Sequence, residues 1–270
     1  MQQTLRTAIN RFPRLKAHLK RLRDVFMPSA SVSSHYIEMK PAEIGTETTR
    51  LRSAWQADGL PRRQRALVDR QLEDYRRGLP VDVFDVLVRA LRELPEMRSG
   101  MSVLEIGCSS GFYSEVLEIA ELPLTYTGCD YSEAFIALAR ENYPALRFDV
   151  EDATALRYRD GAFDVVISGC CLLHIPEYEQ AVAETARVAK HYAIFHRTPV
   201  VIGPPNRYFR KQAYGVETVE IHFNEPQFLA LLEQHGLELE ATYTLNEEWD
   251  VHDPQIGSAN RTYVCRKVTR

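Results

Sequence analysis

The stretch VLEIGCSSGF, residues 103–112, decides the fold. Its first four residues include three large apolar side chains, typical of a buried strand, and Gly107 begins a turn that passes directly into a helix. Gly107 and Gly111 stand four positions apart, so backbone N–H groups at the helix start can approach a ligand closely. A dinucleotide site would need a further glycine where Ser109 stands. The stretch indicates either a ligand-binding turn of another kind or a plain tight turn.

A carboxylate ends the next predicted strand, in the stretch YTGCDYS at residues 126–132. Asp130 comes 19 positions after Gly111, and in a parallel sheet it reaches the crevice at the carboxyl ends of the strands. There it can accept hydrogen bonds from both hydroxyls of a ribose. Ser132 is expected to cap the following helix. Alone, Asp130 is equally an ordinary helix-start carboxylate; with the glycine turn it favours a nucleoside site.

Short strands and helices alternate after Gly100, which is the pattern of parallel βαβ units. Near the C-terminus Asn224, with Gln227 three residues later, is expected to cap a helix that ends at Gly236. The sequence therefore predicts an α/β fold. Five parallel strands are expected at 102–106, 125–129, 146–150, 163–168 and 192–196, and two last strands at about 239–245 and 262–268.

The first hundred residues are expected to be helical. Residues 31–99 predict a helical cap with helices over 61–77 and 81–94, since apolar side chains recur there on one face. Residues 1–30 carry seven basic residues against one acid, a net charge of +6 that leaves −10 for the remainder. An apolar stripe over residues 13–26 either packs on the helices that follow or makes a peripheral membrane or protein contact.

Two further stretches extend this pattern: FDVEDATAL at 148–156 and GAFDVVISG at 161–169. With the glycine turn and Asp130, the chain resembles the class I S-adenosylmethionine-dependent methyltransferases of the small soluble, seven-stranded Rossmann-like type. The resemblance implies a doubly wound, mostly parallel seven-stranded sheet over residues 100–270, beneath an N-terminal helical cap. It also implies that residues 199–223, between the fifth strand and the late helix, form an acceptor-binding insertion.

S-adenosyl-L-methionine is the cofactor that this resemblance implies. Asp152 would accept from the adenine amine and Ala153 would donate its backbone N–H, while Glu105 would hold the turn or a polar group of the cofactor. Phe112 and Tyr131 would supply apolar surface, although Phe112 is equally a core residue. The cofactor-binding residues expected on this basis are Glu105, Gly107, Cys108, Gly111, Phe112, Asp130, Tyr131, Asp152, Ala153, Ser168 and Gly169.

Two histidines are candidates for a catalytic role. If the acceptor is a hydroxyl, a general base within hydrogen-bond reach would speed the transfer, and histidine titrates near neutral pH. His174 follows the fourth strand and His196 ends the fifth; each is equally a satisfied structural residue. Cys170 and Cys171 with His174 have poor spacing for a metal, because adjacent side chains at a strand end point to opposite faces, so no metal site is expected.

Composition narrows the possible functions. An acidic body disfavours a long polyanion lying across it, because nucleic-acid affinity comes largely from neutralising phosphates. No apolar run approaches the ~20 residues that span a bilayer, and five cysteines without a CxxC pair fit a reducing compartment, so we expect a cytoplasmic protein. We expect methyl transfer to oxygen or nitrogen of a small molecule. The alternatives are an RNA or protein methyltransferase and a non-catalytic, cofactor-binding regulatory subunit.

Overall fold

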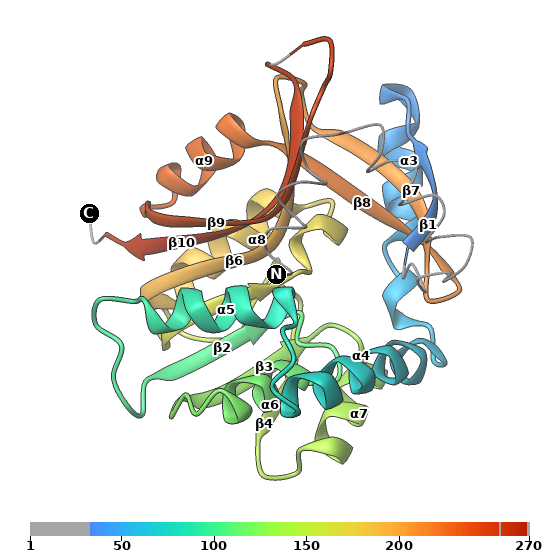
Figure 1. The fold of residues 1–270 in the computed structure, drawn as a ribbon. Helices are drawn as coiled ribbons and strands as arrows, with labels where there is room; N and C mark the ends of the chain where they lie inside the picture. The colour runs from blue at the N-terminus through green and yellow to red at the C-terminus, as the bar shows by residue number, and fades with distance from the viewer. Residues whose placement is uncertain (1–32, 254, 269–270) are drawn as a thin grey trace, which may run out of the picture. The chain divides into compact units, whose positions relative to one another are not determined.

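The computed structural model describes residues 33–253 and 255–268, and parallel strands form its centre (Figure 1). The predicted helix over residues 13–26 lies outside the described residues. Apolar runs buried on both faces place the parallel strands in the interior, as expected of a parallel sheet. All five predicted strands are confirmed: β2 (Ser102–Ile106), β3 (Thr125–Asp130), β4 (Arg147–Val150), β5 (Phe163–Gly169) and β6 (Ala189–Ile202).

The described sheet has ten strands rather than the seven expected. Its order runs β1-β7-β8-β6-β5-β2-β3-β4, and β10 pairs antiparallel with both β6 and β9, which confirms the predicted reversed pair at the C-terminus. The three strands beyond the predicted seven all lie on the β6 side. The added strands and the closing pair are β1 (Ser33–Glu38), β7 (Arg207–Ala213), β8 (Val216–Asn224), β9 (Leu237–Trp249) and β10 (Gly257–Lys267).

The β7–β8 hairpin occupies most of the predicted insertion over residues 199–223. Ala213 pairs with Val216, so the turn consists of Tyr214 and Gly215, both with positive φ, at 50° and 81°. This is the backbone that a tight two-residue hairpin needs, because its twist matches that of the strands. The segment is therefore regular antiparallel structure and not a loop.

Strand β6 serves two sets of neighbours. Its first half pairs with β5 as far as Gly169 opposite His196, and Val200 and Val201 beyond that point pair in parallel with β8. The register with β10 slips between Arg261 and Tyr263, opposite the same place. A bulge of this kind re-aims a side chain and bends the strand. The sheet therefore branches at residues 196–198, where the parallel core gives way to the hairpin.

Helices cover both faces of the central strands. One apolar core joins β2 and β5 to helices α4 to α7, and a second joins the opposite face to α8 and α9. The helices expected over 61–77, 81–94 and after Asn224 are confirmed, and the Asn224 side chain accepts from the Gln227 N–H at 3.0 Å. Residues 33–38, expected as helix, are strand β1. The helices are α3 (Pro41–Leu51), η1 (Ala54–Gln56), α4 (Leu60–Arg76), α5 (Asp82–Arg92), α6 (Phe112–Ile119), α7 (Glu133–Asn142), η2 (Leu172–His174), α8 (Tyr178–Val188) and α9 (Glu225–Gln234).

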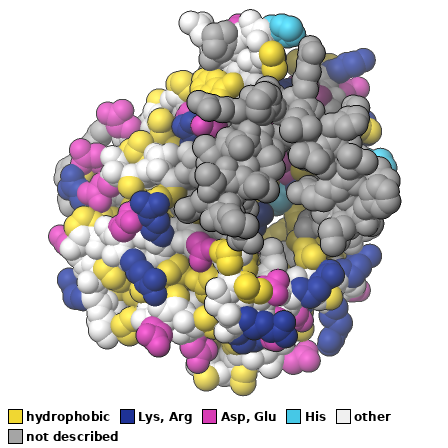
Figure 2. Space-filling model, in the orientation of Figure 1, with side chains coloured by type: hydrophobic (Ala, Val, Ile, Leu, Met, Phe, Trp, Pro, Cys, Tyr) yellow, Lys and Arg dark blue, Asp and Glu magenta, His cyan; other side chains and the backbone are white. Residues whose placement is uncertain are grey.

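Basic and acidic side chains are interspersed over the visible part of the described surface (Figure 2). Among the residues that the structure describes, no helix has the length and hydropathy required to cross a membrane. The five cysteines are all free thiols.

Candidate functional site

The register of the parallel strands brings the predicted site residues together at one edge of the sheet. Ile106 lies opposite Cys129 on β3 and opposite Ser168 on β5, so the turn after β2 has Asp130 on one side and Ser168 on the other. Asp130 in turn lies opposite Val150 at the end of β4. Open α/β sheets bind ligands in the crevice at the carboxyl ends of their strands.

The glycines of the turn are required by packing as well as by conformation. Gly107 and Gly111 have φ of 71° and 75°, in the region that favours glycine. A Cβ on Gly107 would lie 2.3 Å from the Cβ of Cys171, and one on Gly111 would lie 2.7 Å from the ring of Phe148. Sequence analysis explained these glycines by the approach of a ligand; in the structure, side chains of the protein itself fill the space.

Asp130 ties the glycine turn to the next helix. One carboxylate oxygen accepts the Ser109 N–H and the other accepts the Ser132 N–H, both at 3.0 Å. The side chain is buried, and burial raises the pKa of Asp130 to about 6, against the opposing effect of these backbone donors. Each oxygen keeps lone-pair capacity for a further donor. Asp130 is therefore positioned to receive hydroxyl donors.

Three serine hydroxyls around this carboxylate have no partner among the described residues. They belong to Ser109, Ser110 and Ser132, and all three are buried. Ser132 stands at the N-cap of α7 as predicted, but its side chain makes no capping hydrogen bond. Buried hydroxyls without partners are rare in folded proteins and call for a water or a ligand. The donor and acceptor set fits a polar, hydroxyl-bearing ligand such as a nucleoside.

The remaining predicted cofactor residues divide into an outer and an inner set. Asp152 is exposed, accepts from the N–H and hydroxyl of Thr154, and lies 3.9 Å from Arg52, whose carbonyl accepts from the Tyr131 hydroxyl. Ala153 next to it is half-buried. In the inner set Phe112 packs on Tyr113 with ring centroids 4.5 Å apart. Cys108, Ser168 and Gly169 line the strand ends, the first two of them buried.

Glu105 is buried, and the hydrogen bond of its side chain goes to β3 and not to the turn. It accepts a hydrogen bond from the Tyr126 hydroxyl, and a Cβ on Gly169 would lie 2.5 Å from its Oε1. Burial is the main cause that raises the pKa of Glu105 to about 8, and the Tyr126 hydroxyl opposes the shift. The carboxyl is therefore mostly protonated at neutral pH, which suits an interior position between β2, β3 and β5.

The variant Glu105→Gln, which copies the protonated carboxyl, should change how stability depends on pH. Because the folded-state pKa of about 8 exceeds the ordinary 4.5, the contribution of Glu105 to stability is complete below pH 4.5 and is lost as pH rises through 8. Because glutamine does not titrate, the variant does not lose stability in this way as the pH rises. Urea unfolding at pH 5, 7 and 9 should show the wild type falling behind the variant by a few kcal/mol at pH 9. Parallel pH profiles for the two proteins would contradict this.

The two candidate histidines occupy different settings. The His174 Nδ1 lies 2.6 Å from the Val219 carbonyl, so it carries the proton and leaves Nε2 as the acceptor. Its ring packs against that of Trp55 at a tilt of 48°, with centroids 4.6 Å apart. Burial, followed by the charge of Lys211, lowers the pKa of His174 to about 3. His196 is buried, with Nε2 3.0 Å from the Tyr113 hydroxyl and Nδ1 2.8 Å from the Thr262 hydroxyl. Both nitrogens of His196 are thus engaged.

Several residues at this edge escaped sequence analysis. Trp55 lies in η1, within the predicted helical cap, and contacts His174 and Tyr214. Tyr113 and Arg197 meet at the point where β6 leaves β5. Gly215 is a local signal for the hairpin turn that was not used, and nothing local to Arg197 indicates its setting. Among the described residues, no three histidine, cysteine, aspartate or glutamate side chains group as a metal site.

Comparison with known proteins identifies the central part of the chain. Residues 104–196 match a family model described as a methyltransferase domain. These residues form a methyltransferase domain. The strands β2 to β6 and the glycine turn all fall within the matched residues of this methyltransferase domain.

Relatives of the methyltransferase domain share only part of the chain. A Mycolicibacterium smegmatis protein named "Probable S-adenosylmethionine-dependent methyltransferase" is 29% identical over 53% of this chain and 54% of its own. The demethylmenaquinone methyltransferase of Shouchella clausii is 34% identical over 35% of this chain and 43% of its own. The chain thus spans about half or less of the length of these relatives. A solved structure titled the [4+2]-cyclase SpnF has a TM-score of 0.50 at 18% identity, covering 69% of this chain and 82% of its own, which shows the shared fold.

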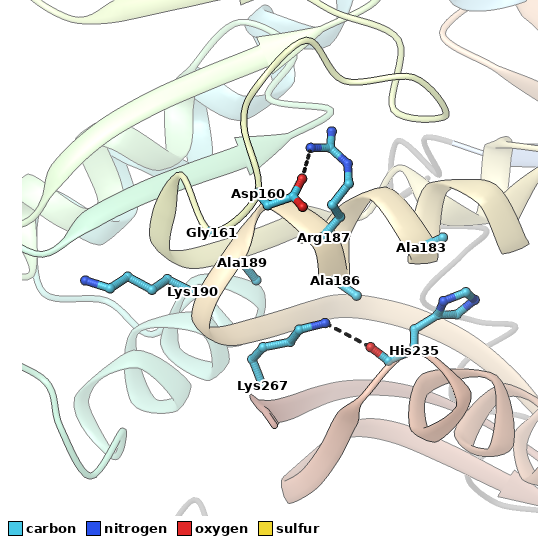
Figure 3. A pocket seen from close by; sticks show the side chains of 9 residues that line it. All are labelled: Asp160, Gly161, Ala183, Ala186, Arg187, Ala189, Lys190, His235 and Lys267. Atoms are coloured by element: carbon cyan, nitrogen blue, oxygen red, sulfur yellow. Dashed lines mark hydrogen bonds and ion pairs between the residues drawn. The ribbon is translucent and has the colours of Figure 1, made fainter. Parts of the chain in front are cut away.

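A pocket also opens at the opposite edge of the methyltransferase domain (Figure 3). It lies where β5 and β6 begin, since Gly161 and Ala189 line it. Its charged groups are already satisfied: Asp160 pairs with Arg187 at 2.8 Å, and the Lys267 ammonium donates to the His235 carbonyl at 3.0 Å. This pocket is remote from the carboxyl ends of the strands, and we assign no function to it.

Proposed function

We propose that the chain transfers a methyl group from S-adenosyl-L-methionine to oxygen or nitrogen of a small molecule. The observation that carries the proposal is the buried Asp130 carboxylate beside the glycine turn, with three serine hydroxyls around it that lack partners among the described residues. These groups suit a nucleoside, and they stand at the edge of the sheet where α/β proteins bind ligands.

When bound, S-adenosylmethionine supplies an electrophilic methyl group on sulfur. We assign Asp130 to the ribose, Asp152 and Ala153 to the adenine ring, and the ends of β2 and β5 to the amino-acid portion. The protein then needs to orient the acceptor and exclude water, which lowers the barrier through proximity. The segment α3–α4 and the β7–β8 hairpin would enclose the acceptor, which accords with a small molecule.

Calorimetry tests the proposal directly. Full-length protein is titrated with S-adenosylmethionine and with S-adenosylhomocysteine, and we expect saturable heat with both. A folded protein that gives no heat with either compound would overturn the proposal. Release of S-adenosylhomocysteine in the presence of a small-molecule cell extract then separates a methyltransferase from a cofactor-binding subunit without turnover.

His174 is the better of the two histidine candidates, since its Nε2 remains available while both nitrogens of His196 are engaged. With a pKa of about 3, His174 stays neutral and is a weak base, so we assign it to orienting the acceptor by accepting a hydrogen bond. His196 would position Tyr113.

The variant His174→Ala should release S-adenosylhomocysteine about 10-fold more slowly, because one hydrogen bond to the acceptor is lost. Its affinity for S-adenosylmethionine should stay within twofold of the wild type, roughly the accuracy expected of such a comparison. His191→Ala is the matched control, since His191 lies beside Asp164 at the opposite edge of the sheet. Unchanged turnover in His174→Ala would remove the assignment.

Two alternatives remain outcomes of these measurements. The fold is shared with a protein titled a cyclase, so binding without methyl transfer would favour a different reaction or a regulatory role. Methylation of RNA or protein, with no transfer to small molecules, would favour a macromolecular acceptor. The free cysteines accord with the cytoplasmic location that we propose.

A further inference from the structure

Strained backbone gathers at the edge of the sheet that carries the site. Six described residues other than glycine have positive φ, and four of them are Ser109 at 49°, Cys170 at 61°, Arg197 at 59° and Tyr214 at 50°. Ser109 follows β2 and Cys170 follows β5. Arg197 lies within β6, and Tyr214 is in the hairpin turn. Strained residues persist where the surroundings fix them, and they concentrate at functional sites. Arg197 carries the only cationic side chain among these four.

Arg197 stands where the sheet branches. The bulge opposite Thr262 turns its backbone, and its N–H lies 3.4 Å from the Thr262 hydroxyl. Proximity to Cys170 is the largest influence that raises the pKa of Arg197, and burial opposes it. The Tyr113 hydroxyl, which also hydrogen-bonds the Arg197 side chain, and the Tyr214 hydroxyl add to the rise. The guanidinium is therefore charged and directed among β5, α6 and the hairpin.

The charge of Arg197 lacks a counter-ion within the described part of the chain. No described carboxylate forms an ion pair with it, and its Nε is buried without a hydrogen-bond partner. Two cations on β7 do have carboxylate partners: Arg210 lies 3.4 Å from Glu47, and Lys211 pairs with Glu220. Arg197 is half-buried, and a charge withdrawn from water is costly unless it is paired. Arg210 and Lys211 on β7 are thus neutralised, whereas Arg197 is not.

Two further polar atoms, on residues that contact Tyr214, also lack partners among the described residues. These are the indole Nε1 of Trp55 and the amide Oε1 of Gln64. Trp55 packs on Tyr214 with centroids 6.1 Å apart, and Gln64 hydrogen-bonds Tyr214. With the Arg197 Nε, the indole makes two buried donors close to the same tyrosine.

From this arrangement we infer that Arg197 binds an anionic oxyacid group of the methyl acceptor, with the Trp55 indole as a second donor. Guanidinium forms short, charge-assisted hydrogen bonds to carboxylates and phosphates. The inference rests on the proposed function and names the class of its acceptor, a small acid. Arg197 lies within β6, on the far side of β5 from Asp130, so it faces the acceptor and not the nucleoside.

The test compares full-length wild type with Arg197→Gln, Arg197→Lys and, as a matched control, Arg89→Gln, an exposed arginine of α5 paired with Glu93. Small molecules of a cell extract are divided on an anion exchanger into retained and unretained pools, and release of S-adenosylhomocysteine is measured with each. We expect activity in the retained pool, with kcat/KM lowered about 100-fold in Arg197→Gln, partly recovered in Arg197→Lys and unchanged in Arg89→Gln. Phosphatase treatment of the pool distinguishes a phosphate from a carboxylate.

A second arm separates the acceptor from the amino-acid carboxylate of the methyl donor. Arg197→Gln should bind S-adenosylhomocysteine and 5′-methylthioadenosine, which lacks that carboxylate, as the wild type does. Weaker binding of S-adenosylhomocysteine alone would overturn the inference, as would activity confined to the unretained pool or an unaffected Arg197→Gln. Thermal unfolding confirms that each variant is folded. Wild-type protein that binds no S-adenosylhomocysteine, or transfers to neither pool, would count against the proposed function itself.

Discussion

Gly107→Ala should be destabilised by about 3 to 4 kcal/mol and should lose most of its affinity for S-adenosylmethionine. About 1 to 2 kcal/mol comes from placing an L side chain in left-handed backbone, and a further ~2 kcal/mol from overpacking. The overpacking arises because the new Cβ would lie 2.3 Å from the Cβ of Cys171. Relief of that contact must move the turn and the end of β5 apart, which displaces the Ser109 N–H from Asp130. Urea unfolding and calorimetry measure the two effects.

Gly78→Ala is the matched control for this experiment. Gly78 has φ of 75°, close to the 71° of Gly107, but a Cβ there would have nothing within 4 Å. The control should therefore lose only the conformational part, about 1 to 2 kcal/mol, and keep its cofactor affinity. If the two variants lose equal stability, the contact with Cys171 is not what requires glycine at position 107.

Asp130→Asn should bind S-adenosylmethionine about 100-fold more weakly than the wild type. The variant keeps the size of the side chain but loses its charge and one acceptor oxygen, and charge-assisted hydrogen bonds contribute roughly 1.5 to 3 kcal/mol each. The pKa of about 6 adds a second signature. Wild-type affinity should fall as pH drops below 6 and the carboxyl takes up a proton, whereas the affinity of the variant should not follow that titration.

Asp164→Asn controls for the loss of a carboxylate that links two strands. Asp164 accepts the N–H and hydroxyl of Ser102, each at 2.8 Å, but at the opposite edge of the sheet. This variant should lose stability and keep its affinity for S-adenosylmethionine at every pH. Equal affinities in Asp130→Asn and the wild type would show that Asp130 only braces the turn through Ser109 and Ser132.

The core of the fold could be predicted because its signals are local. Buried strands such as β2 and β5 are short apolar runs that end in a turn residue, and parallel pairing of these strands predicts that Asp130 lies beside the glycine turn. The β7–β8 hairpin was predicted only as an insertion, since its strands mix charged and apolar side chains. Lys211 and Glu220 are buried there as a pair, so the polar pattern concealed two strands.

The acceptor side was harder to predict because it depends on contacts between distant segments. Arg197 follows a histidine in an apolar strand, and nothing in that neighbourhood shows that the backbone will turn there. Its conformation results from the departure of β6 from β5 and from the bulge opposite Thr262. Trp55 likewise belongs to a segment expected only to cover the domain. The described structure was needed to show that these residues share one edge of the sheet with His174.

The branching of β6 also affects how the protein can diverge in evolution. The hairpin joins the central sheet through two residue pairs in register, Val200 with Phe223 and Val201 with Asn224, whereas β5 and β10 hold the rest of the strand. Exchange of the hairpin for one of another length would disturb that short junction and leave the glycine turn and Asp130 in place. With the acceptor enclosed by the hairpin, as we propose, acceptor preference can diversify among descendants while the half of the molecule that holds the methyl donor is inherited intact.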